Sequence, residues 1–89
     1  MPTKAKVSKK VKSDVAEYAN YPLSKIKDSQ ELKKNPLKMD TPKLNYLTLS
    51  LRAYIKKHNS KQTLLAKEIK KSKFTVKKLV DLVYKKITG

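Results

Sequence analysis

Apolar residues recur at helical spacing in the middle of the chain. Thr41 is a good N-cap, Pro42 suits the first helical position, and the pattern ends near His58. The spacing therefore predicts a helix that follows the Thr41 cap, begins at Pro42 and is apolar along one stripe. This stripe comprises Leu44, Leu47, Leu51 and Ile55.

A second, weaker stripe lies on roughly the opposite side of this predicted helix. It comprises Tyr46, Leu49 and Ala53. A helix that is apolar on two sides usually contacts different partners on each. One side is expected to pack on the C-terminal helices and the other on residues 13–40. Because residues 13–40 are loosely patterned, the second stripe also indicates a binding surface for a partner protein.

Two further helices are predicted near the C-terminus. Ser60 is a plausible cap for a short helix reaching about Lys71, which would present Leu65, Ala66 and Ile69 inward. Ser72 is a plausible cap for a last helix over 73–87. The apolar stripe of that last helix comprises Val76, Leu79, Val80, Val83 and Ile87.

The first 42 residues are predicted to be less regular. Residues 1–12 are interpreted as a disordered basic arm that could lie along a phosphate backbone, the alternative being a solubilising tail. The lysines of this arm are Lys4, Lys6, Lys9, Lys10 and Lys12. Residues 13–42 are expected to form short helices and Pro-containing loops, with Asp14 and Glu17, and again Asp28 and Glu31, at capping-box spacing.

Together these elements predict a small all-α domain of three to four helices, with a helical DNA-binding core over 43–89 that the loops and the arm precede. The spacing over 62–81 fits a helix-turn-helix, with Ala66 as the small residue of its first helix. The turn departs from that pattern, because Lys70 stands where Gly is favoured. A plain helical hairpin is the alternative.

The net charge is the feature of the composition that bears most on function. The 89 residues carry a net charge of +16, and residues 41–89 alone hold 13 basic and 2 acidic groups. Such an excess attracts polyanions. The cations are 22 lysines and a single arginine, Arg52, which favours phosphate contacts over base readout.

The outward side of the predicted helix-turn-helix concentrates these cations around an aromatic residue. We expect a nucleic-acid-binding face here, although an ordinary solvated face is the alternative and Phe74 could instead fold back at the start of its helix. The predicted contacts are Lys67, Lys70, Lys71, Lys73, Phe74, Lys77, Lys78 and Lys85.

Several function classes are disfavoured by composition. The chain has no Cys, one His and one Gly, which excludes thiolate sites, His clusters and Gly-rich phosphate loops. The carboxylates suit helix caps better than metal sites. We therefore expect no enzyme activity, no cofactor and no metal. No run of apolar residues suits a membrane span or a secretory signal, which predicts a cytoplasmic or nucleoid-associated protein.

The Lys-rich start, Lys4 to Lys12, and the basic helical end, Lys67 to Lys86, give the chain a general likeness to a known group. It resembles the small, Lys-rich, Cys-free DNA-associated proteins of thermophilic archaea, which include basic accessory subunits of crenarchaeal replicative B-family DNA polymerases. The predicted function is low-specificity binding of duplex DNA through lysine–phosphate contacts. The resemblance implies a partner protein as well as DNA, so the alternative is an accessory subunit of a replication or transcription complex, with a partner such as a DNA polymerase. Association with RNA or the ribosome is a third possibility.

Overall fold

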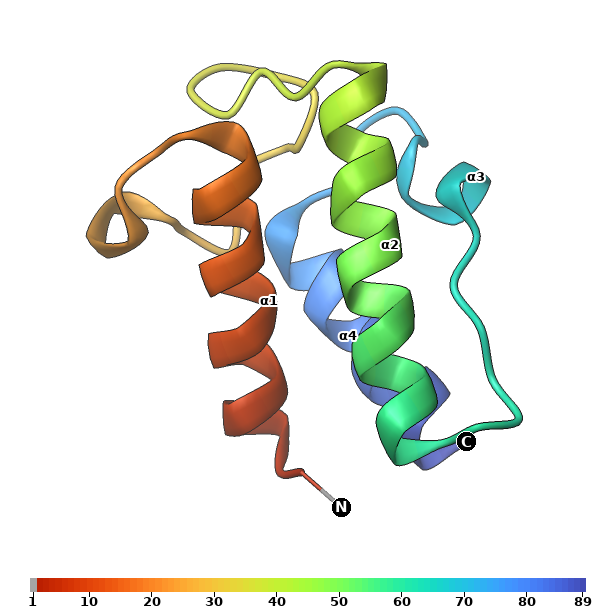
Figure 1. The fold of residues 1–89 in the computed structure, drawn as a ribbon. Helices are drawn as coiled ribbons and strands as arrows, with labels where there is room; N and C mark the ends of the chain where they lie inside the picture. The colour runs from red at the N-terminus through yellow and green to blue at the C-terminus, as the bar shows by residue number, and fades with distance from the viewer. Residues whose placement is uncertain (1) are drawn as a thin grey trace.

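The computed structural model describes residues 2–89 and confirms a small all-α fold (Figure 1). Its helices are α1 (Lys4–Ala19), α2 (Thr41–His58), the single turn α3 (Ala66–Ile69) and α4 (Val76–Thr88), with a 3-10 turn η1 (Leu23–Lys25) after α1. Helix α1 packs against both α2 and α4, while α3 packs on another side of α2. The domain is therefore a three-helix bundle of α1, α2 and α4 with α3 as an addition.

Helix α1 corrects the prediction of a disordered arm over residues 1–12. Thr3 caps it by accepting a hydrogen bond from the Lys6 amide at 3.2 Å. Val7, Val11 and Val15, spaced four residues apart, are fully buried in the core. The lysines between them point away from that stripe because a helix separates the two sets by its period. Apolar burial on one side thus orders a segment whose composition suggested a tail.

The C-terminal part of α1 corrects the predicted helix cap at Asp14. Asp14 lies in the middle of the helix rather than capping a new one. The helix ends at Ala19, and its C-cap Asn20 adopts a left-handed conformation with φ of 54°. Asn tolerates this conformation better than most residues. The amide of Tyr21 then donates to the Ala16 carbonyl at 3.0 Å, which closes the helix end.

Helix α2 confirms the predicted element, but not its packing on two sides, because the second stripe of Tyr46, Leu49 and Ala53 is exposed instead of packing on residues 13–40. Leu44, Leu47, Leu51 and Ile55 are all buried, and the helix ends at His58 as expected. Its cap is Asp40 rather than Thr41, since an Asp40 carboxylate oxygen accepts from the Lys43 amide at 3.1 Å. The cap and the first helical residue, Thr41, therefore each lie one residue before the positions that the sequence predicts.

The C-terminal half keeps the predicted order of two helices but changes their bounds. Residues 60–65 lead into α3 without forming a helix, and Leu65 itself has extended backbone angles. Leu64 is buried while Leu65 is exposed, which reverses the predicted inward position of Leu65. The cap of α4 is Thr75 instead of Ser72, and it accepts from the Lys78 amide at 3.2 Å. The predicted stripe on α4 is buried as expected.

Residues 28–32 lie along the start of α4 and join the two halves of the chain. The Leu32 amide donates to the Phe74 carbonyl at 3.0 Å, and Glu31 and Thr75 form an isolated antiparallel bridge. At the other end of the bundle, the Asn59 side chain donates to the carbonyls of Lys86 and Ile87 at 3.1 and 3.3 Å. Both ends of α4 are thus held by polar contacts from distant parts of the chain.

Candidate nucleic-acid interface

The five lysines expected on a free arm lie on α1, and three of them are engaged. Lys4 pairs with Asp81 at 2.8 Å, Lys10 with Asp14 at 3.0 Å and Lys12 with Asp28 at 2.9 Å. Lys6 and Lys9 are exposed and have no ion pair to a carboxylate anywhere in residues 2–89. Three of the five positive charges of this segment are therefore paired with carboxylates of the protein itself.

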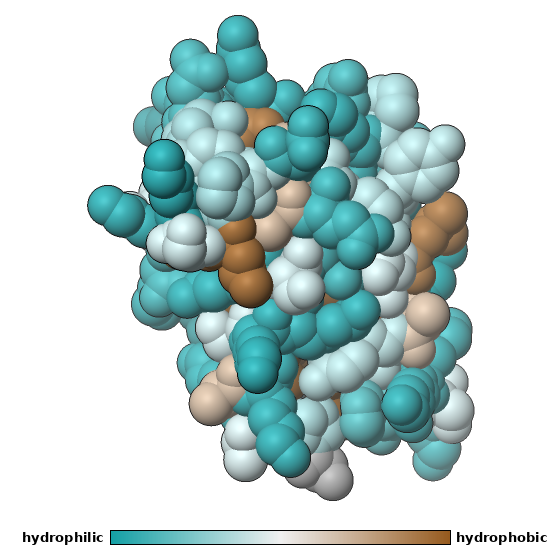
Figure 2. Space-filling view, turned by 60° about the vertical axis from the view of Figure 1, so that its left-hand side comes forward, coloured by the Kyte–Doolittle hydropathy of each residue, from teal (hydrophilic) through white to brown (hydrophobic). Residues whose placement is uncertain are grey.

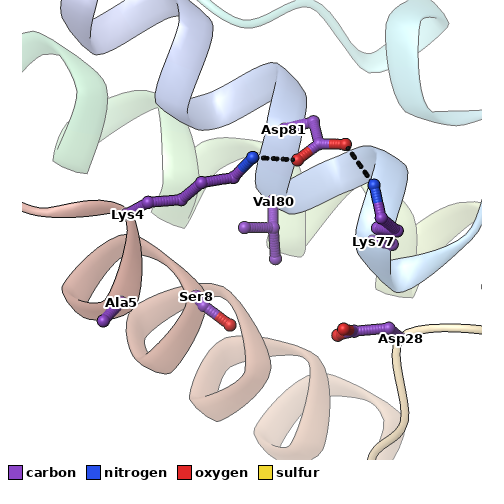
Figure 3. Close-up of a pocket in the computed structure, with 7 residues that line it drawn as sticks. All are labelled: Lys4, Ala5, Ser8, Asp28, Lys77, Val80 and Asp81. Carbon is purple, nitrogen blue, oxygen red and sulfur yellow. Dashed lines mark hydrogen bonds and ion pairs between the residues drawn. The ribbon is translucent and has the colours of Figure 1, made fainter.

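Figure 3 shows the depression where α1 meets α4, lined by Lys4, Ala5, Ser8, Asp28, Lys77, Val80 and Asp81. Both cations point at one carboxylate, with Lys77 lying 3.1 Å from Asp81. Hydrogen bonds from Lys4 and Lys77 hold the pKa of Asp81 below its usual range, and the bond to Asp81 raises the pKa of Lys4. The depression therefore presents a neutralised cluster rather than an anion site.

The lysines of α3, the α3–α4 turn and the outward side of α4 differ from those of α1. Lys77, a predicted contact, pairs with Asp81, and Lys86 pairs with Glu68. Within the described chain none of the other lysines here pairs with a carboxylate, and all are exposed except the half-buried Lys70. We call this set the C-terminal lysine surface; it comprises Lys67, Lys70, Lys71, Lys73, Lys78 and Lys85.

Helix α4 and the Glu68–Lys86 ion pair determine where the lysines of this surface lie. Lys78 and Lys85 are seven residues apart and so lie on one line along α4, away from its buried stripe. Glu68 of α3 binds Lys86 of α4 at 3.1 Å, which places α3 beside α4. Burial alone would raise the pKa of Glu68, but hydrogen bonds from the Leu65 amide and Lys86, with nearby Lys71, lower it. The two acidic groups beside these lysines in residues 2–89, Glu68 and Asp81, are thus both already paired.

Phe74 is not the free ring that the sequence suggested. Its side chain is half-buried and packs against the hydrophobic core, and its carbonyl accepts from Leu32. The alternative, that the ring turns back toward the protein, agrees with this burial. Phe74 therefore leaves the set of predicted nucleic-acid contacts.

The turn between α3 and α4 also differs from the expected one. Lys70 has φ of −84°, and the left-handed residue is Lys73, with φ of 60°. Helix α3 has only four residues, so the pair lacks the full first helix of a helix-turn-helix.

The first amides of α4 are occupied by other groups of the protein. The Val76 amide donates to the Gln30 carbonyl at 2.9 Å, and the Lys77 amide donates to the Asp28 carbonyl at 3.0 Å. A helix N-terminus binds phosphate through such amides when they are free. Here phosphate would have to be bound by side chains of α4.

The predicted partner-binding residues Tyr46, Leu49 and Ala53 are all exposed on α2. The ring of Tyr46 lies nearly parallel to that of Tyr18, with 6.4 Å between ring centres. Leu65 was missed as a member of this surface, because a helical pattern placed it inward. The signal that could have found it is the pair Leu64-Leu65, since neighbours in an extended segment point to opposite sides.

Comparison with protein-family models, curated proteins and solved structures finds no match for this chain. No helix in residues 2–89 is both long and apolar enough to cross a membrane. Over the same residues, no group of three or more His, Cys, Asp or Glu side chains could hold a metal ion.

Proposed function

We propose that this protein binds nucleic acid, chiefly duplex DNA, through contacts between lysine side chains and phosphates. The observation that carries the proposal is the uneven distribution of ion pairs. The C-terminal lysine surface has no carboxylate partner in the part of the chain that the structure describes, whereas Lys4, Lys10 and Lys12 of α1 all have one. Cations without internal partners are the ones whose counterions a polyanion can displace.

The mode of contact follows from the residue types. A lysine ammonium is a mobile point charge that suits phosphate, whereas bidentate base readout favours arginine. The sole arginine, Arg52, is on α2 and donates its Nε–H to the Leu64 carbonyl at 2.8 Å. The amides of Val76 and Lys77 at the start of α4 are already hydrogen-bonded within the protein. This disfavours insertion of the first turn of α4 into a DNA groove, as in a helix-turn-helix. Binding should accordingly show low sequence specificity.

The salt dependence of duplex binding tests this proposal. Contact with some five to eight phosphates predicts that log K falls against log salt with a slope of about −4 to −7. Replacing Lys71, Lys78 and Lys85 with Gln should weaken binding to a fluorescent duplex and make the slope less steep by about 2 to 3. Fluorescence anisotropy across a salt series measures both quantities.

The matched control removes the same charge from α1 and α2. Replacing Lys6, Lys9 and Lys57 with Gln takes away three exposed cations that have no ion pair within residues 2–89. The control should bind the duplex nearly as the native protein does. Equal losses in both variants would contradict a localised surface, and a slope near zero would contradict nucleic-acid binding. Competition with single strands and structured RNA then separates DNA from RNA as the ligand.

A further inference from the structure

The outward side of α2 exposes a continuous row of apolar side chains. Tyr46 is 60% exposed and Leu49 is 55% exposed, and the exposed Ala53 follows one turn later. Their spacing of three and four residues is that of a seam between packed helices. Tyr46, Leu49 and Leu65 are three of the four large apolar side chains exposed in the part of the chain described; the fourth is Leu23.

Leu65 extends this row sideways from α2. Arg52 binds the Leu64 carbonyl at 2.8 Å, and the Lys56 ammonium donates to the Gln62 carbonyl at 3.1 Å. Arg52 and Lys56 follow Leu49 by three and seven residues and share its side of the helix. Residues 62–65 are therefore held along this side of α2, with Leu65 exposed at 41%.

Basic groups predominate along the border of this apolar face. The Glu68 carboxylate accepts a hydrogen bond from the Leu65 amide at 2.9 Å, and it is also paired with Lys86 at 3.1 Å. Residues 41–65 include five basic groups and no acidic one. The basic groups are Lys43, Arg52, Lys56, Lys57 and Lys61. The face thus combines an apolar centre with a basic rim, and its complement is an apolar centre with an acidic rim.

We infer that this face binds an acidic amphipathic helix of a partner protein. Apolar side chains of that helix would lie on Tyr46, Leu49 and Leu65, and its carboxylates would face the basic rim. A second copy of this chain is disfavoured, because it would bring two basic rims together at a net charge of +16 each. Nucleic acid is disfavoured, because a phosphate backbone offers no apolar surface to the two leucines.

A synthetic peptide tests this directly. The probe is a labelled, end-blocked peptide of about 16 residues with Leu at helical i, i+3, i+4 and i+7 spacing and Glu on its other sides. Two controls keep the length: one replaces Glu with Lys, and the other keeps Glu but replaces Leu with Ser. Fluorescence anisotropy should detect binding of the acidic amphipathic peptide and of neither control.

Variants of the protein locate the binding site. Replacing Leu49 and Leu65 with Ser should weaken peptide binding by about tenfold or more, since apolar anchors dominate such interfaces. The matched control is Leu23→Ser, which removes the other exposed leucine and should leave binding unchanged. Both leucines of the test variant are exposed, so far-UV circular dichroism should show an intact fold. Duplex DNA binding by the test variant should also be unchanged, which separates this inference from the proposed function.

Four outcomes would overturn the inference. Equal binding of the Leu-to-Ser peptide would mean charge attraction alone. Native affinity in the Leu49→Ser, Leu65→Ser variant would place the site elsewhere. A dimer in analytical ultracentrifugation that this variant abolishes would assign the face to a second copy. Binding of an oligo-thymidylate that is lost on Tyr46→Ala, without peptide binding, would assign the face to single-stranded nucleic acid.

Discussion

At the scale of single residues, Asp14 shows how a charged side chain can be part of this core. It is almost fully buried between α1 and α2, where it accepts hydrogen bonds from the Lys10 ammonium at 3.0 Å and the Ser50 hydroxyl at 2.7 Å. A buried carboxylate is tolerated when its oxygens are bonded in this way. Asp14 therefore fixes the register of the two helices as well as their contact.

Replacing Asp14 with Ala should destabilise the protein by about 1–3 kcal/mol, because Lys10 and Ser50 lose their shared partner in a half-buried site. Urea denaturation followed by circular dichroism measures the change. Glu17→Ala is the control: Glu17 is exposed on the same helix and has no ion pair in residues 2–89. Its effect should stay within about 0.5 kcal/mol. Equal effects would show that Asp14 contributes nothing specific.

At the scale of elements, α1 is the part that most needed the structure. The stripe of Val7, Val11 and Val15 is short and β-branched, and the lysines around it outweigh it in any average over the segment. Its helical state depends on packing against α2 and α4, which most helices of this length require. The sequence alone therefore could not distinguish this helix from a basic tail.

Replacing Val11 with Ala should cost about 1–3 kcal/mol in the free energy of unfolding, because the methyl groups leave a cavity between helices. Thermal or urea denaturation provides the measurement. Lys9→Ala, an exposed change two residues away, should shift stability by no more than about 0.5 kcal/mol. If the Val11→Ala variant were as stable as the native protein, α1 would not pack in the core, and residues 1–12 would be a disordered arm.

The predictability of α2 and α4 has a clear physical basis. Each helix carries a long stripe of apolar residues that recur every three or four positions, and Pro42 marks the start of α2. Helix α3 was harder, because Leu64, Leu65 and Ile69 fit both a longer helix and an extended segment followed by one turn. Tertiary contacts decide between these, namely the bond from Arg52 to Leu64 and the pair of Glu68 with Lys86.

At the scale of the whole molecule, the sequence predicted the total charge but not which charges remain unneutralised. The pairs Lys4–Asp81 and Lys12–Asp28 join residues far apart in the chain, so no local pattern reveals them. Figure 2, with α1 turned forward, shows a mostly hydrophilic surface broken by isolated hydrophobic areas. The sequence therefore predicted which residue types form the candidate surface. The fold removes from it the paired lysines of α1, together with Lys77 and Phe74.

The charge imbalance also predicts how the intact protein responds to salt. Six lysines pair with five acidic groups in residues 2–89, while the net charge of +16 leaves a large repulsion between the remaining cations. Salt screens both effects, but the unneutralised charges outnumber the surface pairs, which are individually weak. The midpoint of thermal unfolding should therefore rise between about 20 and 300 mM NaCl, where the Debye length falls from roughly 20 to 6 Å. The Asp81→Asn variant lacks one carboxylate and its pairs with Lys4 and Lys77. Its unfolding midpoint should therefore rise more between these salt concentrations than that of the native protein. A midpoint that falls with salt would instead mean that the ion pairs of α1 outweigh the repulsion, and differential scanning fluorimetry distinguishes the two signs.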